Sequence, residues 1–144
     1  MTLHIIKLCV GADSVEDLAQ WQAGRIREQK KRGKKKPELI HVTRMTPKRK
    51  DEILDGGSLY WVIKGQIAVR QRLIDIRPVT KNGRPHCGLV YDPKIVPVQR
   101  RSHRPFQGWR YFDPKDAPAD ARGAKGLQHL PENLQRELVE LGLL

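Results

Sequence analysis

Basic and aromatic side chains are the residues of this sequence whose types and spacing point to chemistry. The segment RPFQGWRYF, residues 104–112, holds four of the eight aromatic residues of the chain, interleaved with Arg104 and Arg110. Aromatic faces stack on unpaired bases for about 1 to 3 kcal/mol each, and arginine adds phosphate and cation–π contacts. The alternative is that Phe106 and Trp109 fill one end of a core, because large aromatic residues serve packing more often than ligands.

Positive charge is concentrated in one part of the chain. Residues 25–50 contain twelve Lys or Arg and two Glu, in a chain of 144 residues with a formal net charge of +12. Such a block attracts polyanions, since each phosphate that it neutralises releases condensed counterions. We therefore expect a non-catalytic nucleic-acid-binding module, with RNA as its partner, and with single strands, loops or a modified base as the bound form. For the run at 30–37 the alternative is a flexible, solvated loop.

The expected binding residues are cations that contact phosphate and side chains that contact bases. The phosphate contacts are expected from the basic block and from the hairpin after it: Arg44, Lys48, Arg49, Lys50, Arg70 and Arg72. Trp109 and Tyr60 are expected to offer stacking faces, and Gln107 an amide that reads a base edge. Lys64 and Arg110 complete the predicted set.

Two other functions stay open. The first is a small hydrolase or transferase that acts on a nucleotide or a phosphorylated small molecule, with Lys64, Arg110, Tyr111 and Asp55 in one pocket. The second is a protein-interaction adaptor with an exposed apolar patch. The sequence has no Walker-type phosphate loop, nucleophile elbow or metal-binding quartet, so we predict no catalytic residue, cofactor or metal.

The elements that must position these residues follow from hydrophobic periodicity. Apolar alternation predicts strands at 4–10 and 39–45, a hairpin at 58–77 with a turn at Lys64-Gly65, and further strands near 87–91, 95–99 and 109–112. Helices are expected after Asp13 or Ser14, after Pro47 and over 130–144. A change of parity near Leu73 predicts a β-bulge. The expected fold is α+β, a small, mostly antiparallel barrel with flanking helices.

Length and composition indicate one domain over residues 1–144, with the loop at 30–37 inside it. No apolar run approaches the roughly 18 residues of a membrane span, and the first residues do not form a secretory signal. Cys9 and Cys87 are expected to be free thiols. We therefore expect a cytoplasmic protein without a membrane partner.

Three segments carry a resemblance to a known family. In HIIKLCVG with SVEDLAQWQ, in DEILDGGSLYWVIKGQIAVRQRLIDI and in RPFQGWRYF, the chain resembles short bacterial proteins grouped as domain of unknown function 1489. A looser likeness, in the order of the elements and in the strand, Lys-Gly, strand unit, is to the PUA-like small barrels, which include the ASCH and EVE domains. That likeness implies a PUA-like barrel whose cleft holds RNA or a single base, as an analogy of fold.

Overall fold

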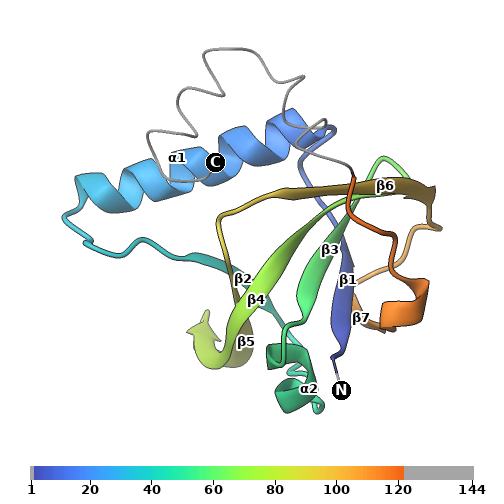
Figure 1. The fold of residues 1–144 in the computed structure, drawn as a ribbon. Helices are drawn as coiled ribbons and strands as arrows, with labels where there is room; N and C mark the ends of the chain where they lie inside the picture. Colours follow the sequence, from blue (N-terminus) through green and yellow to red (C-terminus); the bar gives the residue numbers. More distant parts are fainter. Residues whose placement is uncertain (1, 122–144) are drawn as a thin grey trace.

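The computed structural model describes residues 2–121, and these form a bent sheet with one long and one short helix. Helix α1 (Val15–Lys31) lies across one end of the sheet, and helix α2 (Lys50–Leu54) lies at the opposite end, near the start of the chain (Figure 1). The strands are β1 (His4–Leu8), β2 (Leu39–Thr43), β3 (Ser58–Ile63), β4 (Gln66–Lys81), β5 (Arg84–Tyr91), β6 (Val96–Ser102) and β7 (Trp109–Phe112), and the 3-10 helix η1 (Pro114–Asp116) follows them. The predicted helix at 130–144 lies outside the described residues.

The α+β class and the mostly antiparallel sheet are confirmed, but the expected closed barrel is wrong. The strand order is β2-β5-β4-β3-β1-β7, with β6 paired to β4, and β1 and β3 form a parallel pair within the described residues. The outermost strands, β2 and β7, do not pair with each other, so the sheet stays open. Closure is not needed to bury the apolar face, because the buried stripe of α1 covers it: Val15, Leu18, Ala19, Gln22, Ala23 and Ile26.

Strand β4 bends the sheet. Its first half pairs with β3 and β6, and its second half pairs with β5. The register shifts between Leu73 and Asp75, which confirms the predicted bulge and leaves Ile74 exposed. The turns on either side of β4 are tight, since Lys64-Gly65 and Asn82-Gly83 all have positive φ, as a type I′ turn requires.

Apolar side chains fill both faces of the central strand β3. Leu59, Trp61 and Ile63 belong to the main core below α1, and Tyr60 and Val62 belong to a second cluster with β7 and the segment before it. All six residues of β3 are buried. The expectation that Tyr60 offers a stacking face therefore fails, because its ring is buried. It assumed one solvated face, whereas Phe106, Phe112 and Val98 cover that face.

Candidate functional site

A cavity of about 590 Å³ opens between α1 and the sheet. Its walls come from residues 7–12 at the end of β1, from α1, from β2, from Trp61 of β3 and from the end of β4. The N-cap of α1 fixes one wall, because the Ser14 side chain accepts a hydrogen bond of 3.0 Å from the backbone N–H of Asp17. Five segments that are far apart in sequence thus meet at one hollow.

Basic side chains line this cavity. Lys7, Arg25, His41 and Lys81 contribute to its walls, and no Asp or Glu of the described residues does. Lys7 is half-buried and gains from an anion that enters beside it, whereas Arg25 and Lys81 are exposed and add positive charge at the cavity. The lining therefore favours an anionic ligand.

Two indole rings give the cavity flat surfaces. Trp61 is buried, with 3% of its surface exposed, and the edge of the His41 ring meets it at a centroid distance of 5.8 Å. Trp21 is 45% exposed, and the Arg25 guanidinium lies 4.7 Å from the centroid of its ring. A planar ring that enters the cavity can stack on Trp21, whereas Trp61 is packed against the rings of His41 and Tyr91 and forms a buried part of the wall.

Burial changes the acid–base properties of the lining. It lowers the pKa of His41 to about 4, helped by the charges of Lys7 and Lys81, so this imidazole is neutral at pH 7. Burial also lowers the pKa of the Lys7 amine, which Cys9 opposes. The pKa of the Cys9 thiol is raised to about 11, again by burial, so this sulfur stays protonated.

A buried amide pair holds Trp61 in place. The side chains of Gln22 in α1 and Gln71 in β4 are both fully buried and exchange hydrogen bonds of 2.8 and 2.7 Å. The indole N–H of Trp61 donates to Oε1 of Gln71 at 2.9 Å. Because every partner is satisfied inside the core, the position of Trp61 is tied to the position of α1.

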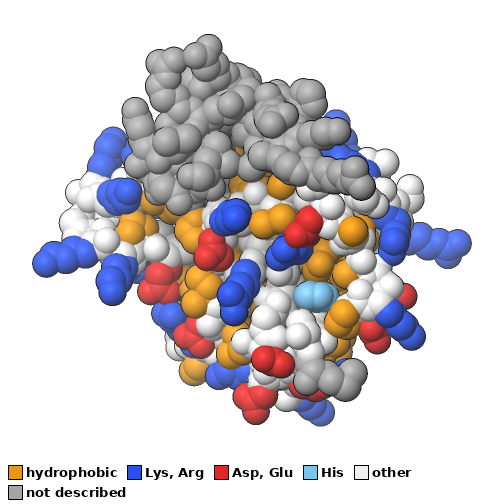
Figure 2. Space-filling view, in the orientation of Figure 1, with side chains coloured by type: hydrophobic (Ala, Val, Ile, Leu, Met, Phe, Trp, Pro, Cys, Tyr) orange, Lys and Arg blue, Asp and Glu red, His pale blue; other side chains and the backbone are white. Residues whose placement is uncertain are grey.

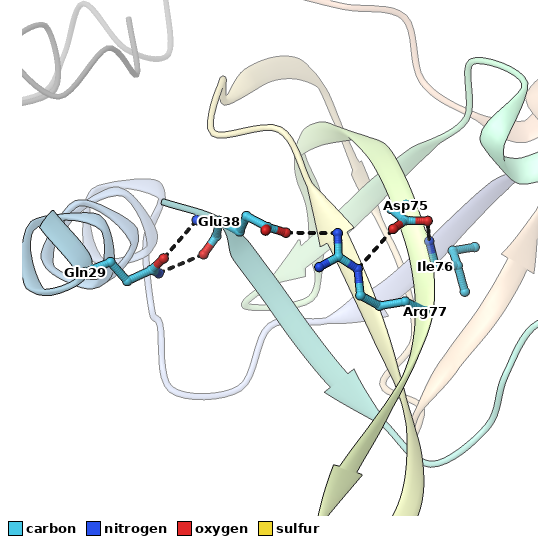
Figure 3. A network of polar contacts seen from close by, with 5 residues as sticks. All are labelled: Gln29, Glu38, Asp75, Ile76 and Arg77. Carbon is cyan, nitrogen blue, oxygen red and sulfur yellow. Dashed lines mark hydrogen bonds and ion pairs between the residues drawn. The ribbon is translucent and has the colours of Figure 1, made fainter. Parts of the chain in front are cut away.

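A second polar network, drawn in Figure 3, fastens the far end of α1. The Gln29 amide bonds both backbone groups of Glu38, at 2.8 and 2.9 Å, and the Glu38 carboxylate pairs with Arg77 of β4 at 3.0 Å. Arg77 also donates to Asp75 at 3.0 Å. The network sets the spacing between α1, the start of β2 and β4.

The cavity continues into two smaller hollows. One, of about 140 Å³, shares Trp21, Arg25 and Ile40 with it and reaches Lys34. The other, of about 470 Å³ and more open, shares Val79 and Thr80 and reaches the β4–β5 turn at Gly83. Glu38 also lines the first of these hollows, so the absence of acidic residues among the described positions is a property of the cavity and not of both its neighbours.

The structure brings part of the predicted site together at β7, beside the cavity. Trp109 is half-buried, and its indole N–H donates to the Met45 carbonyl at 2.8 Å. The Tyr111 hydroxyl accepts the backbone N–H groups of Lys48 and Arg49, at 2.9 and 3.2 Å. Trp109 and Tyr111 meet edge to face at 5.0 Å, because residues two apart in a strand lie on the same side of it. This arrangement turns Trp109 toward the segment that follows β2.

Other predicted residues are engaged within the protein. Tyr60 lies between the rings of His4 and Phe112, with 4% of its surface exposed, so it offers no stacking face. Arg70 makes an ion pair with Asp120 at 2.7 Å and donates to Ser58 at 3.0 Å. Arg49 pairs with Glu52 through two hydrogen bonds, of 2.5 and 2.8 Å. A phosphate would have to compete with these carboxylates.

The remaining predicted residues are exposed and scattered. Arg44 and Lys50 lie near α2, Lys64 in the β3–β4 turn, Arg72 on β4, and Gln107 and Arg110 in or before β7. The Arg110 guanidinium lies 5.1 Å from the Phe106 ring centroid. None of the three hollows described above has any of the eleven predicted residues in its lining, nor the Lys64, Arg110, Tyr111 and Asp55 set.

The surface charge is mixed on the face of the molecule drawn in Figure 2. Lysine and arginine side chains there are interspersed with aspartates and glutamates, and they do not form one unbroken cationic surface. The basic block predicted from residues 25–50 is divided between α1, the connection after it and the segment that leads into α2. The cavity differs from this surface because the charged side chains of its described lining are all cations.

Comparison with known proteins places the chain in a family. The family model described as "Protein of unknown function (DUF1489)" matches residues 5–144. The chain belongs to this family. A search of curated proteins and a search of solved structures found no match.

Sequence reasoning missed the residues that line the DUF1489 cavity, although some left a signal. Lys7 is a lone charge inside the apolar strand HIIKLCV, and Trp21 stands beside the buried stripe of α1 rather than in it. His41 was assigned to a strand without a role. No residue spacing connects these positions, because three separate segments carry them.

Two further findings concern the described part of the DUF1489 chain. Residues 2–121 contain no group of three or more His, Cys, Asp or Glu placed to hold a metal ion. No helix in this region is both long enough and apolar enough to cross a membrane.

Proposed function

We propose that this DUF1489 chain binds RNA in a single-stranded or looped form, and that one nucleotide unit occupies the cavity between α1 and the sheet. The observation that carries the proposal is the lining of that cavity, with three cations, the exposed indole of Trp21 and no acidic residue among the described positions. Phosphate is attracted by the cations, and an unpaired base has a face that stacks on an indole.

The geometry favours this cavity over the surface expected from sequence. In that surface Tyr60 is covered, Arg70 and Arg49 are paired with carboxylates, and Trp109 donates to a carbonyl. We therefore assign the phosphate contacts to Arg25, Lys81 and Lys7. Trp109 keeps a supporting role, because it is the register partner of Lys7 across the β1–β7 pair.

The two hollows that adjoin the cavity support a chain-like ligand. Each of them shares lining residues with the cavity, and the smaller one is lined by both Lys34 and Glu38. A single strand is flexible enough to place neighbouring nucleotides in separate hollows, and its bases are free to stack. In the order of its elements the chain is similar to the PUA-like group, although its sheet is open. We also propose a cytoplasmic location, where RNA is present.

Fluorescence anisotropy with a labelled single-stranded RNA, measured over a series of salt concentrations, tests the proposal. We expect the double variant Arg25→Gln, Lys81→Gln to weaken binding at least tenfold and to reduce the salt slope by about 1.4, for two lost phosphate contacts at about 0.7 each. The control Arg100→Gln, Lys115→Gln changes the net charge equally at exposed positions outside the cavity. Equal losses of RNA affinity in the two double variants would mean that net charge alone drives the association, and would reject the cavity as the binding site.

A second function, an enzyme acting on a phosphorylated small molecule, is favoured by one observation. The cavity holds a lysine of lowered pKa and a neutral histidine, which are the groups that proton transfer and nucleophilic catalysis use. Mononucleotides that bind as tightly as RNA oligomers, and are converted, would favour this function over the first.

A further inference from the structure

Lys7 has an unusual position for a lysine. It follows Leu3 and Ile5 on the side of β1 that faces the main core, and both of those residues are buried. In the sheet register it lies between Trp61 of β3 and Trp109 of β7. Its side chain is half-buried and lines the 590 Å³ cavity, so a small ligand can reach it.

The groups around Lys7 leave its amine without a carboxylate in the cavity. His41 of β2, Lys81 of β4, Arg25 of α1 and Cys9 on its own segment line the same hollow, and no described Asp or Glu does. Burial lowers the pKa of the amine, which raises the fraction present as the neutral, nucleophilic form near pH 7. Lysines that are desolvated beside other cations are the ones that react with carbonyl groups.

We propose that Lys7 captures an anionic aldehyde that enters the cavity and forms an imine with it. The lone pair of Nζ attacks the carbonyl carbon and gives a carbinolamine. The carbon–oxygen bond then breaks, one water molecule leaves, and a carbon–nitrogen double bond forms without any oxidation or reduction. Both hydrogens of the neutral amine end on the departing oxygen, and we assign their relay to the neutral imidazole of His41, which lines the same cavity.

The lining defines the class of aldehyde. Arg25 and Lys81 favour a phosphorylated compound, and the exposed ring of Trp21 favours one that carries a ring. Two sources share this chemistry, a free phosphorylated aldehyde and the ring-opened sugar of an abasic nucleotide within a nucleic acid strand. The second source rests on the function proposed above, and the first does not.

Reductive trapping tests the proposal on the intact chain. Pyridoxal phosphate with cyanoborohydride at pH 7, followed by peptide mapping, should label Lys7 at least tenfold faster than the exposed Lys115. Because exposed lysines have a pKa near 10.4, this preference should grow as the pH falls from 9 to 7. Pyridoxal without its phosphate should show a smaller preference. Labelling of Lys7 that is no faster than that of Lys115 would overturn the proposal.

Matched variants locate the adduct. Lys7→Arg keeps the positive charge and should lose the fast adduct, whereas Lys115→Arg should keep it. Should Lys7→Arg fail to fold, the relative labelling rates in the natural chain still decide the question. Persistence of the fast adduct in a folded Lys7→Arg chain would contradict the assignment.

A second arm separates the two sources. A single-stranded oligonucleotide with one abasic site is incubated with the chain and borohydride, next to the same strand without that site. A crosslink through Lys7 supports a nucleic acid source, and labelling by pyridoxal phosphate alone supports a free aldehyde. No adduct in either arm, with RNA binding intact, overturns the imine but leaves the proposed function standing. Fast labelling of Lys7 without RNA binding supports the imine and rejects the proposed RNA-binding function.

Discussion

Gln22 and Gln71 face each other across the core and exchange two hydrogen bonds, one in each direction between α1 and β4. Gln71 also accepts from the indole of Trp61 and donates to the carbonyl of Asp92 at 3.1 Å. One amide therefore connects a helix, two strands and the connection after β5. The depth of the cavity depends on this amide, because Trp61 forms part of its wall.

The first prediction concerns this amide pair. Gln71→Leu leaves the Gln22 amide and the indole N–H of Trp61 buried without a partner, and each such group costs about 1 to 3 kcal/mol. We expect the free energy of unfolding, measured by urea titration, to fall by about 2 to 4 kcal/mol. The double variant Gln22→Leu, Gln71→Leu removes both amides and should recover part of the loss. A double variant that loses the sum of the two single effects would contradict the coupling.

The second prediction compares two tryptophans. Trp21→Ala removes an exposed ring at the cavity and should weaken binding of single-stranded RNA by about 5- to 160-fold, which corresponds to a stacking energy of about 1 to 3 kcal/mol. Trp109→Ala removes a half-buried ring that donates to Met45, so it should lower the unfolding free energy by about 2 kcal/mol and change affinity less. Anisotropy and thermal unfolding of both variants measure this. A larger loss of RNA affinity in Trp109→Ala than in Trp21→Ala would indicate that the stacking face lies on β7.

The third prediction concerns pH. The pKa of His41 falls from its ordinary 6.5 to about 4 on folding, so the unfolded chain binds more protons between these values. Stability contributed by the neutral ring is therefore complete above about pH 6.5 and is lost as the pH falls toward 4. His4 has a lowered pKa too and contributes with the same sign.

The quantity to measure is the difference between the natural chain and His41→Gln. Urea titrations at several values from pH 4 to 7 should show a flatter dependence in the variant, by on the order of 2 kcal/mol across the window. Parallel curves for the two proteins would mean that folding leaves the pKa of His41 unchanged. A His4→Gln chain serves as the comparison, because His4 lies outside the cavity.

The fourth prediction uses two glycines. A Cβ at Gly57 would lie 2.1 Å from the Leu3 carbonyl oxygen and 2.4 Å from that of Ile53, both backbone atoms. Gly57→Ala should therefore destabilise the chain by about 3 kcal/mol or more, through a forced shift of β1 against α2. Gly24→Ala in α1 meets nothing within 4 Å and should stabilise the chain by about 0.5 to 1 kcal/mol. Thermal unfolding measures both changes, and equal effects would contradict the close approach at Gly57.

The elements were predictable where local patterns specify them. The buried stripe of α1, the Lys64-Gly65 turn, the bulge after Leu73 and the strand at 109–112 all follow from spacing and turn chemistry. These features depend on residues close in sequence, so one window of the chain contains the whole signal.

The burial of Tyr60 and the open sheet were not predictable in the same way. Parity along β3 shows that Tyr60 and Trp61 point to opposite faces, but not that both faces are covered. Phe106 and Phe112, which cover Tyr60, are separated from it by more than forty residues. Whether β2 and β7 meet depends on the bends of β4. The residues of the two edge strands carry no information about those bends.

The cavity was the hardest feature to predict. Lys7 and His41 each look like an ordinary strand residue, and Lys81 looks like the polar end of a hairpin. They line one cavity only after α1 has packed across the sheet, at the distance that the hydrogen bonds between Gln22 and Gln71 set. The aromatic residues of RPFQGWRYF predicted a stacking surface at β7. In the structure that segment chiefly covers the second apolar cluster and holds the connection before α2.

Strand β4 sets the register of the three strands that pair with it. Its sixteen residues, 66–81, carry partners on β3, β5 and β6, and side chains alternate between two covered faces along much of its length. One residue added before Leu73 would exchange inside and outside for everything downstream. Related chains should therefore vary in length at the two type I′ turns that flank this strand and keep its span constant, which an alignment of the family can check.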